Sequence, residues 1–254
     1  VVSQMAVGYD NIDVAACTAR GIPVGHTPGV LTETTADLTL ALMLATARRL
    51  CEAVEYVRAG KWVTWRPMEL TGPDLYGSTV GIIGMGRIGQ AVARRLRGFD
   101  CRLLYHQRKP VPEAEALGAV YTDLPRLLEE SDFVTLHVPL TDDTRHLINR
   151  EALARMKPTA ILINTARGPV VDQAALLDAL REGQIAAAGL DVTDPEPLPP
   201  DDPLLALPNV VVLPHIGSAS IQTRTRMAQM AADNLLAGLR GERLPHCVNP
   251  EVYG

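Results

Sequence analysis

The sequence predicts an α/β protein built on a doubly wound parallel sheet. Short hydrophobic runs alternate with helical patterns over most of the chain, as in successive βαβ units. Several of the predicted strands are apolar on both faces, which is typical of strands that helices cover on both sides. With 254 residues, of which 47% are hydrophobic, the chain can fill one large domain, or one domain and part of another.

The elements of this sheet follow one another in a regular order. Six strands are predicted at residues 80–83, 102–106, 133–138, 160–164, 187–191 and 210–213. Four helical patterns lie between them, at residues 88–96, 124–130, 150–156 and 173–182.

The two ends of the chain stand apart from this alternation. Residues 1–30 indicate a strand, a short helix ending before Gly21 and a second strand at 22–24, and residues 220–239 indicate a long amphipathic helix closed by Gly241. Together they hold too little material for an independent core. We expect residues 1–30 and 219–254 to be parts of an incomplete second domain, and the chain, which opens inside a strand pattern, to be a partial one.

The central domain is expected to span residues 31–218 and to begin with a helix and an irregular arm at residues 33–75. The helix, at residues 33–49, is almost wholly apolar and follows Thr32 as a candidate cap. The arm carries both tryptophans of the chain, Trp62 and Trp65. Exposed indoles need a partner surface. We favour an arm that joins two subunits, and the alternative is an arm folded back on its own subunit.

Composition excludes several classes of partner. The formal net charge of −5 speaks against nucleic acid or an anionic membrane as the main partner. The longest apolar run, residues 38–47, is too short to cross a bilayer.

The four cysteines form no CxxC pair, which favours unpaired thiols in a reducing, cytoplasmic compartment. The histidines show no HxxxH or HxH spacing, so we expect no metal site.

A glycine-rich motif indicates a dinucleotide site. Gly84, Gly86 and Gly89 form GxGxxG, with Arg87 and Ile88 inside the motif, a strand directly before it and a helix directly after it. Glycines let the backbone approach a pyrophosphate, which binds at the positive end of the helix. Arg87 can add a cation to the same phosphates.

The residues after the next strand predict the choice of cofactor. An acidic side chain there binds a free ribose 2′-hydroxyl, but this chain has Gln107, Arg108 and Lys109 and no acid between Asp100 and Glu113. A basic loop suits a 2′-phosphate, which Arg108 can bind bidentately. We predict a preference for NADP(H), with NAD(H) possible; the alternative is that these are solvated surface charges.

Three charged residues follow strands in the second half of the sheet: Arg167, Glu196 and His215. Ligands of open α/β sheets bind at the carboxyl ends of strands. Hydride transfer to a 2-keto acid needs a cation that holds the carboxylate and carbonyl, and an acid that protonates the developing alkoxide. Arg167 fits the first task and His215 the second, and a carboxylate from Glu196 on the other ring nitrogen would favour the imidazolium and orient it.

These motifs resemble those of the D-isomer-specific 2-hydroxyacid dehydrogenases over essentially the whole chain. The resemblance rests on the glycine motif and on the segments Asn164-Thr165-Ala166-Arg167-Gly168, Gly189-Leu190-Asp191-Val192 and Leu213-Pro214-His215-Ile216-Gly217. Within the family, the chain is most similar to the glyoxylate/hydroxypyruvate reductases, through Val7-Gly8-Tyr9-Asp10 and Gly60-Lys61-Trp62-Val63-Thr64-Trp65.

The resemblance implies a Rossmann-type nucleotide domain, a flavodoxin-like substrate domain formed by both chain ends, and a homodimer. It places the catalytic Arg, Glu and His on Arg167, Glu196 and His215. Substrate binding would involve the amides of Val7 and Gly8, with Trp65 approaching the neighbouring subunit's pocket. Further cofactor contacts would fall on Val138, Pro139, Thr165, Asp191 and Gly217.

The expected activity is NADPH-dependent reduction of glyoxylate to glycolate and of hydroxypyruvate to D-glycerate. Two alternatives remain at this point. One is a dinucleotide-sensing scaffold similar to the corepressors that share this fold, and the other is a reductase of a different 2-keto acid.

Overall fold

The computed structural model describes residues 1–254, which divide into two compact units. One consists of Val1–Thr35 together with Ser218–Gly254, and the other is Ala36–Gly217. No helix is both long and apolar enough to cross a membrane.

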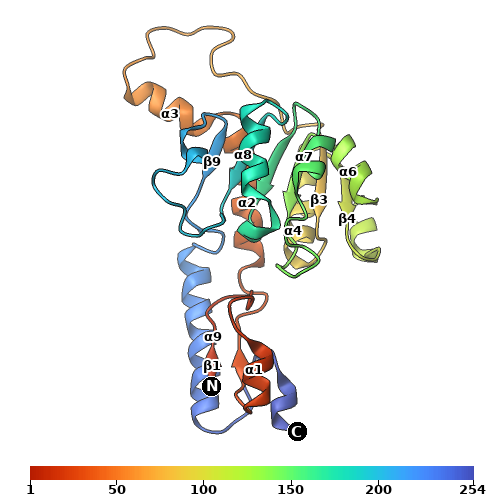
Figure 1. Cartoon of the computed structure of the whole chain (residues 1–254), viewed down its shortest axis with the longest axis vertical. Coiled ribbons are helices and arrows are strands. Elements are labelled where there is room, and N and C mark those ends of the chain that lie inside the picture. The colour runs from red at the N-terminus through yellow and green to blue at the C-terminus, as the bar shows by residue number, and fades with distance from the viewer. The chain divides into compact units, whose positions relative to one another are not determined.

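The larger unit is built on a seven-stranded, entirely parallel sheet of order β5-β4-β3-β6-β7-β8-β9 (Figure 1). Its strands are β3 Thr79–Ile83, β4 Arg102–His106, β5 Val120–Tyr121, β6 Phe133–Leu136, β7 Ile161–Asn164, β8 Ala187–Leu190 and β9 Val210–Val212. The order runs outward in both directions from β3 and β6, so the predicted doubly wound sheet is confirmed. The six predicted strands are present, and β5 is an additional short edge strand.

Helices cover both faces of this sheet. The helices of this unit are α2 Thr32–Ala47, of which residues 36–47 belong to this unit, α3 Leu50–Arg58, α4 Arg87–Leu96, α5 Pro112–Glu115, α6 Leu124–Glu130, α7 Arg150–Arg155 and α8 Gln173–Arg181, and α3 has no buried residue. Asp123, Asn149 and Asp172 cap α6, α7 and α8 by accepting from an amide of the first turn, which fixes where each helix begins.

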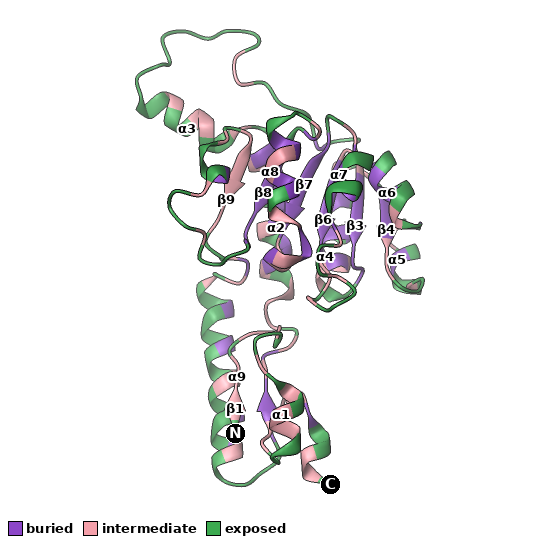
Figure 2. Ribbon diagram, in the orientation of Figure 1, coloured by how far each residue is buried: buried purple, intermediate pink, exposed green.

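Successive side chains along a strand pack into two separate hydrophobic cores, one on each face of the sheet. In β7, Ile161 and Ile163 join the core beneath α2 and α4, whereas Leu162 joins the core beneath α6, α7 and α8. This follows from the twofold period of a strand, and it leaves the central strands buried throughout (Figure 2).

Two details near α2 differ from the sequence prediction. Thr32 is the first helical residue rather than a cap outside the helix, and α2 ends at Ala47. Arg49 adopts a left-handed backbone conformation (φ 52°), and the chain then resumes as α3, a helix that was not predicted. After α3 the arm runs as an irregular loop to β3 (Figure 1).

The smaller unit pairs the two chain ends. Strands β1 Val2–Ser3 and β2 Val24–Gly25 are parallel, α1 Val14–Ala19 lies between them in sequence, and α9 Ile221–Leu239 begins after the N-cap Ser220. Buried Asn234 of α9 donates to the His26 carbonyl and accepts from the His246 amide, so it ties the N-terminal and C-terminal segments together.

Candidate active site

The carboxyl ends of β7, β8 and β9 bring the predicted catalytic residues into one region. These strands are neighbours and parallel, so the residues that follow them share one edge of the sheet. Arg167 follows β7, His215 follows β9, and Glu196 lies in the long connection between β8 and β9.

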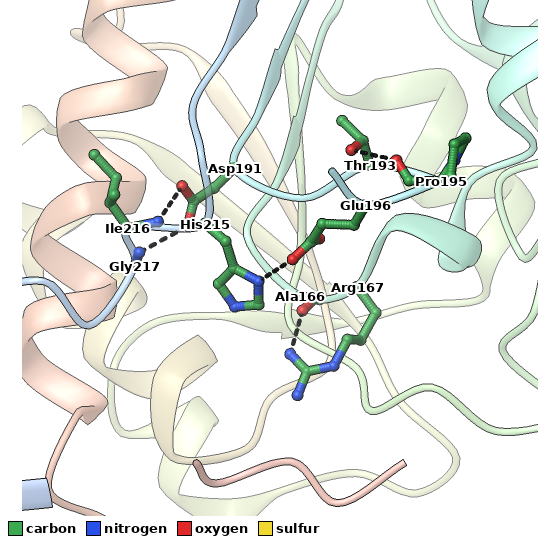
Figure 3. Close-up of polar contacts among 9 residues, drawn as sticks. All are labelled: Ala166, Arg167, Asp191, Thr193, Pro195, Glu196, His215, Ile216 and Gly217. Atoms are coloured by element: carbon green, nitrogen blue, oxygen red, sulfur yellow. Dashed lines mark hydrogen bonds and ion pairs between the residues drawn. The ribbon is translucent and has the colours of Figure 1, made fainter. Parts of the chain in front are cut away.

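His215 and Glu196 form a direct pair. The imidazole Nδ1 lies 2.5 Å from Glu196 Oε1, and the two side chains are 45% and 40% exposed (Figure 3). A bond to Nδ1 fixes the orientation of the ring and leaves Nε2 as the nitrogen that faces a ligand. The partial exposure makes the pair accessible to a small molecule.

The backbone at His215 is held in an uncommon conformation. Its φ of 55° lies in the left-handed region, which residues other than glycine seldom adopt, although Asn, Asp and His do so more often than the rest. Asp191, directly after β8, holds this turn with three bonds: its carbonyl accepts from the His215 amide at 3.0 Å, and its carboxylate oxygens accept from Ile216 at 2.8 Å and Gly217 at 2.7 Å. Asp191 therefore fixes the direction in which His215 leaves the chain (Figure 3).

Asp191 is itself buried, and burial raises the pKa of its carboxyl group. The amides of Ile216 and Gly217 and the nearby His215 act in the opposite direction. The resemblance assigned Asp191 to the nicotinamide amide. Its two observed amide bonds add a role in shaping the His215 turn that sequence reasoning missed.

The turn that carries Arg167 is fixed by Asn164, the last residue of β7. The buried Asn164 amide group donates to the Arg167 carbonyl at 2.9 Å and accepts from the Ala166 amide at 3.0 Å. The Arg167 guanidinium donates to the Ala166 carbonyl. At Gly168 a Cβ atom would lie 1.9 Å from the Thr193 carbonyl oxygen, so only glycine lets this turn pack against the connection that carries Glu196.

The glycine loop has the shape that a pyrophosphate requires. A Cβ on Gly89 would lie 2.1 Å from the Gly84 carbonyl oxygen, and Gly84 has a φ of 95°. In contrast, a Cβ on Gly86 would meet nothing within 4 Å, and Gly86 caps α4 without a side-chain bond. Open space before the uncapped amino end of a ten-residue helix is a site for an anion, and the residues present thus fit a dinucleotide.

Predicted cofactor residues surround this loop. Arg87 is exposed as the first residue of α4, whereas the Ile88 side chain packs against the core. Arg108 and Lys109 are exposed after β4, and the Gln107 side-chain oxygen accepts from the Met85 amide of the loop at 2.8 Å.

The remaining predicted cofactor residues lie after the next strands of the sheet. Val138 and Pro139 follow β6, and the amide of Val138 would lie 2.8 Å from a Cβ on Gly84, so the two loops are in contact. Thr165 follows β7 and its hydroxyl lies 3.0 Å from that of Thr39 in α2.

His137, at the end of β6, was not among the predicted site residues. Its carbonyl oxygen would lie 2.7 Å from a Cβ on Gly84, and its Nε2 lies 3.0 Å from the Thr135 hydroxyl. Burial lowers its pKa to about 3, so the ring stays neutral beside the glycine loop. The available signal was a histidine directly after a buried strand, two residues before Pro139.

The predicted substrate residues lie in different parts of the chain. In the smaller unit, the Val7 carbonyl contacts His26 Nδ1 at 3.1 Å, the Gly8 carbonyl accepts from Gln4, and no bond within the chain uses the amide N–H of either residue. Trp65, in the arm, is 78% exposed. No group of three or more metal-ligating side chains is present.

Comparison with known proteins identifies the family. Residues 40–217 match the model of the D-isomer specific 2-hydroxyacid dehydrogenase NAD binding domain. A glyoxylate reductase of Korarchaeum cryptofilum is 62% identical over 99% of this chain and 76% of its own length. A glyoxylate/hydroxypyruvate reductase B of Escherichia fergusonii is 54% identical over 98% of this chain and 78% of its own length.

Among solved structures, an NADPH-dependent glyoxylate/hydroxypyruvate reductase of Sinorhizobium meliloti, in complex with NADP and malonate, aligns with a TM-score of 0.87 and 43% identity. The alignment covers 97% of this chain and 76% of that chain. The resemblance deduced from the sequence motifs is thereby confirmed. A nicotinamide dinucleotide is the cofactor of the matched domain, and this chain belongs to the D-isomer specific 2-hydroxyacid dehydrogenase family.

Proposed function

We propose that this protein reduces small 2-keto acids, glyoxylate to glycolate and hydroxypyruvate to D-glycerate, with NADPH. The observation that carries the proposal is the Glu196–His215 pair at the carboxyl edge that also presents Arg167. The glycine loop with its open space at Gly86 supports the nucleotide part. The names of the relatives from K. cryptofilum and E. fergusonii support the choice of substrates.

In this proposal each charged side chain has a separate role in binding, protonating or orienting. Arg167 binds the carboxylate and the carbonyl oxygen and stabilises the negative charge that develops on that oxygen. His215 donates its Nε2 proton to the oxygen, while Glu196 holds Nδ1 and keeps the ring in place. When bound, NADPH would supply the hydride that C2 of the keto acid accepts, so one keto acid, one NADPH and one proton give one hydroxy acid and one NADP⁺.

The remaining assignments concern how the ligands are held. The amides of Val7 and Gly8 would bind the substrate carboxylate. Gly84, Gly86 and the start of α4 would hold the pyrophosphate, with Arg87 as an added cation. Asp191, whose carboxylate already orients the His215 turn, would accept from the nicotinamide amide. The four unpaired cysteines favour a reducing compartment, and we place the reaction in the cytoplasm.

The cofactor preference rests on the basic loop after β4. Arg108→Ala is expected to raise the KM for NADPH by about tenfold or more, because it removes a charge-assisted contact to the 2′-phosphate. The KM for NADH should stay the same, since NADH lacks that phosphate. Steady-state kinetics with both cofactors measure this, and a wild-type enzyme that favours NADH would contradict the assignment.

The arm supports a homodimer. Trp62 and Trp65 are 64% and 78% exposed, so the arm does not bury its indoles on its own subunit. Tyr56 of α3 donates to Glu69 of the arm at 2.5 Å, which anchors the returning part of the arm. Leu50, Val54 and Val57 are also exposed on α3, and with the arm they offer apolar area to a second copy.

Trp65→Ala is expected to weaken the dimer or to raise the KM for the keto acid several-fold, because a large apolar contact is lost. Sedimentation measures the subunit mass and initial rates measure the KM. Ile221→Ala removes another exposed apolar side chain, in the smaller unit, and should leave both unchanged. An unchanged KM together with an unchanged mass for Trp65→Ala would reject this role.

A substrate panel tests the function itself. Oxidation of NADPH is followed at 340 nm with glyoxylate, hydroxypyruvate, other 2-keto acids and no substrate. Rapid oxidation with the first two acids supports the proposal. Faster oxidation with another acid would move the assignment to a different keto acid, and nucleotide binding without turnover on any acid would favour a sensing role.

A further inference from the structure

The segment that carries Arg108 and Lys109 is a short loop between β4 and α5, residues 107–111. Pro110 lies within the loop and Pro112 begins α5. Each proline fixes its own φ and disfavours a helical conformation in the residue before it. The loop is therefore restricted near its centre and at its end before any tertiary contact is made.

Two tyrosines hold the ends of this loop. Tyr121 of β5 donates its hydroxyl to the Gln107 carbonyl at 3.2 Å, and the Val111 amide donates to the Tyr105 hydroxyl at 2.9 Å. The two rings contact each other edge to face, with centroids 5.5 Å apart and an angle of 63° between them. One pair of aromatic side chains thus fixes both ends of the segment that presents Arg108.

A third contact joins this loop to the glycine loop. The Gln107 side-chain oxygen accepts from the Met85 amide at 2.8 Å, and Gln90 donates to the Met85 carbonyl at 3.2 Å. The backbone that would bind the pyrophosphate and the backbone that presents the basic side chains are therefore connected through Gln107. The distance between the glycine loop and the basic loop is therefore set before a ligand binds, which lowers the entropy that binding costs.

We propose that Tyr121 is a positioning residue for recognition of the ribose 2′-phosphate, acting through the Gln107 carbonyl on the placement of Arg108. The inference rests on the proposed NADPH preference. Tyr121 itself belongs to a two-residue edge strand and is 40% exposed, so its hydroxyl can be removed without opening the core. Tyr105 is fully buried and holds the Val111 amide, which makes it the less suitable residue to change.

The test is calorimetric binding of adenosine 2′,5′-bisphosphate and of 5′-AMP, which differ only in the 2′-phosphate. Tyr121→Phe keeps the ring contact and removes one hydrogen bond, so affinity for the bisphosphate should fall by about 3- to 10-fold. Affinity for 5′-AMP should stay the same. Tyr253→Phe is the matched control, because it removes a tyrosine hydroxyl that bonds a backbone group, the Leu244 amide, in the smaller unit.

The double variant with Arg108→Ala separates this inference from the cofactor proposal. If Tyr121 acts through Arg108, Tyr121→Phe has no further effect once Arg108 is alanine. A wild-type protein that binds the two nucleotides equally would overturn both proposals. Discrimination that is lost in Arg108→Ala but unchanged in Tyr121→Phe would overturn the role of Tyr121 alone, as would an equal loss of affinity for both nucleotides in Tyr121→Phe.

Discussion

Replacing His215 with asparagine is expected to lower kcat for glyoxylate by about 10²- to 10⁴-fold, the usual effect of losing a general acid. Asparagine suits this test because it tolerates the left-handed backbone that His215 adopts, with a φ of 55°. The fold and nucleotide binding should therefore survive. Initial rates measure the loss, and a thermal unfolding curve close to that of the wild type shows that the loss is chemical.

His146→Asn is the matched control for that variant. His146 is also an exposed histidine with a left-handed backbone, with a φ of 52°, and it has no part in the proposed mechanism. Its replacement should leave kcat near the wild-type value. Near-normal turnover in His215→Asn would rule out His215 as the proton donor.

Replacing Arg167 with alanine is expected to have the second large effect. Because Arg167 binds both the carboxylate and the carbonyl oxygen in this account, kcat/KM should fall by about 10²-fold or more. Arg167→Lys keeps the charge but loses the planar fork, so its activity should lie between those of Arg167→Ala and the wild type. Rates over a range of keto acid concentrations separate the change in KM from the change in kcat.

Arg181→Ala, at the exposed end of α8, provides the control for a lost arginine. It should keep wild-type kinetics. If Arg167→Ala also kept a wild-type kcat/KM, Arg167 could not be the group that binds the substrate.

The parallel sheet was predictable because its signals are local. Apart from β5, the strands of the sheet each contain a short apolar run, and polar caps such as Asp172 mark where helices begin. What escaped prediction has no such signal. Edge strand β5 is only two residues long, and α3 is separated from α2 by a left-handed arginine, Arg49, where a glycine is more usual.

The candidate site was predictable in its residue types but not in its local geometry. Residues that follow neighbouring parallel strands must lie at one edge, which is why Arg167 and His215 could be grouped from sequence. The left-handed turn at His215 and the bonds that Asp191 makes to it depend on contacts between separate loops. Likewise, nothing in the local sequence indicates that Gln107 bonds the amide of Met85.

The most direct test of the account is the product that forms from hydroxypyruvate. NADPH oxidation at 340 nm is compared with the amount and chirality of the glycerate that appears, determined by chromatography on a chiral phase. We predict one D-glycerate for each NADPH oxidised, and about 10²- to 10⁴-fold less of this product with His215→Asn at matched times. Formation of L-glycerate, or NADPH oxidation without glycerate, would contradict the proposed reaction.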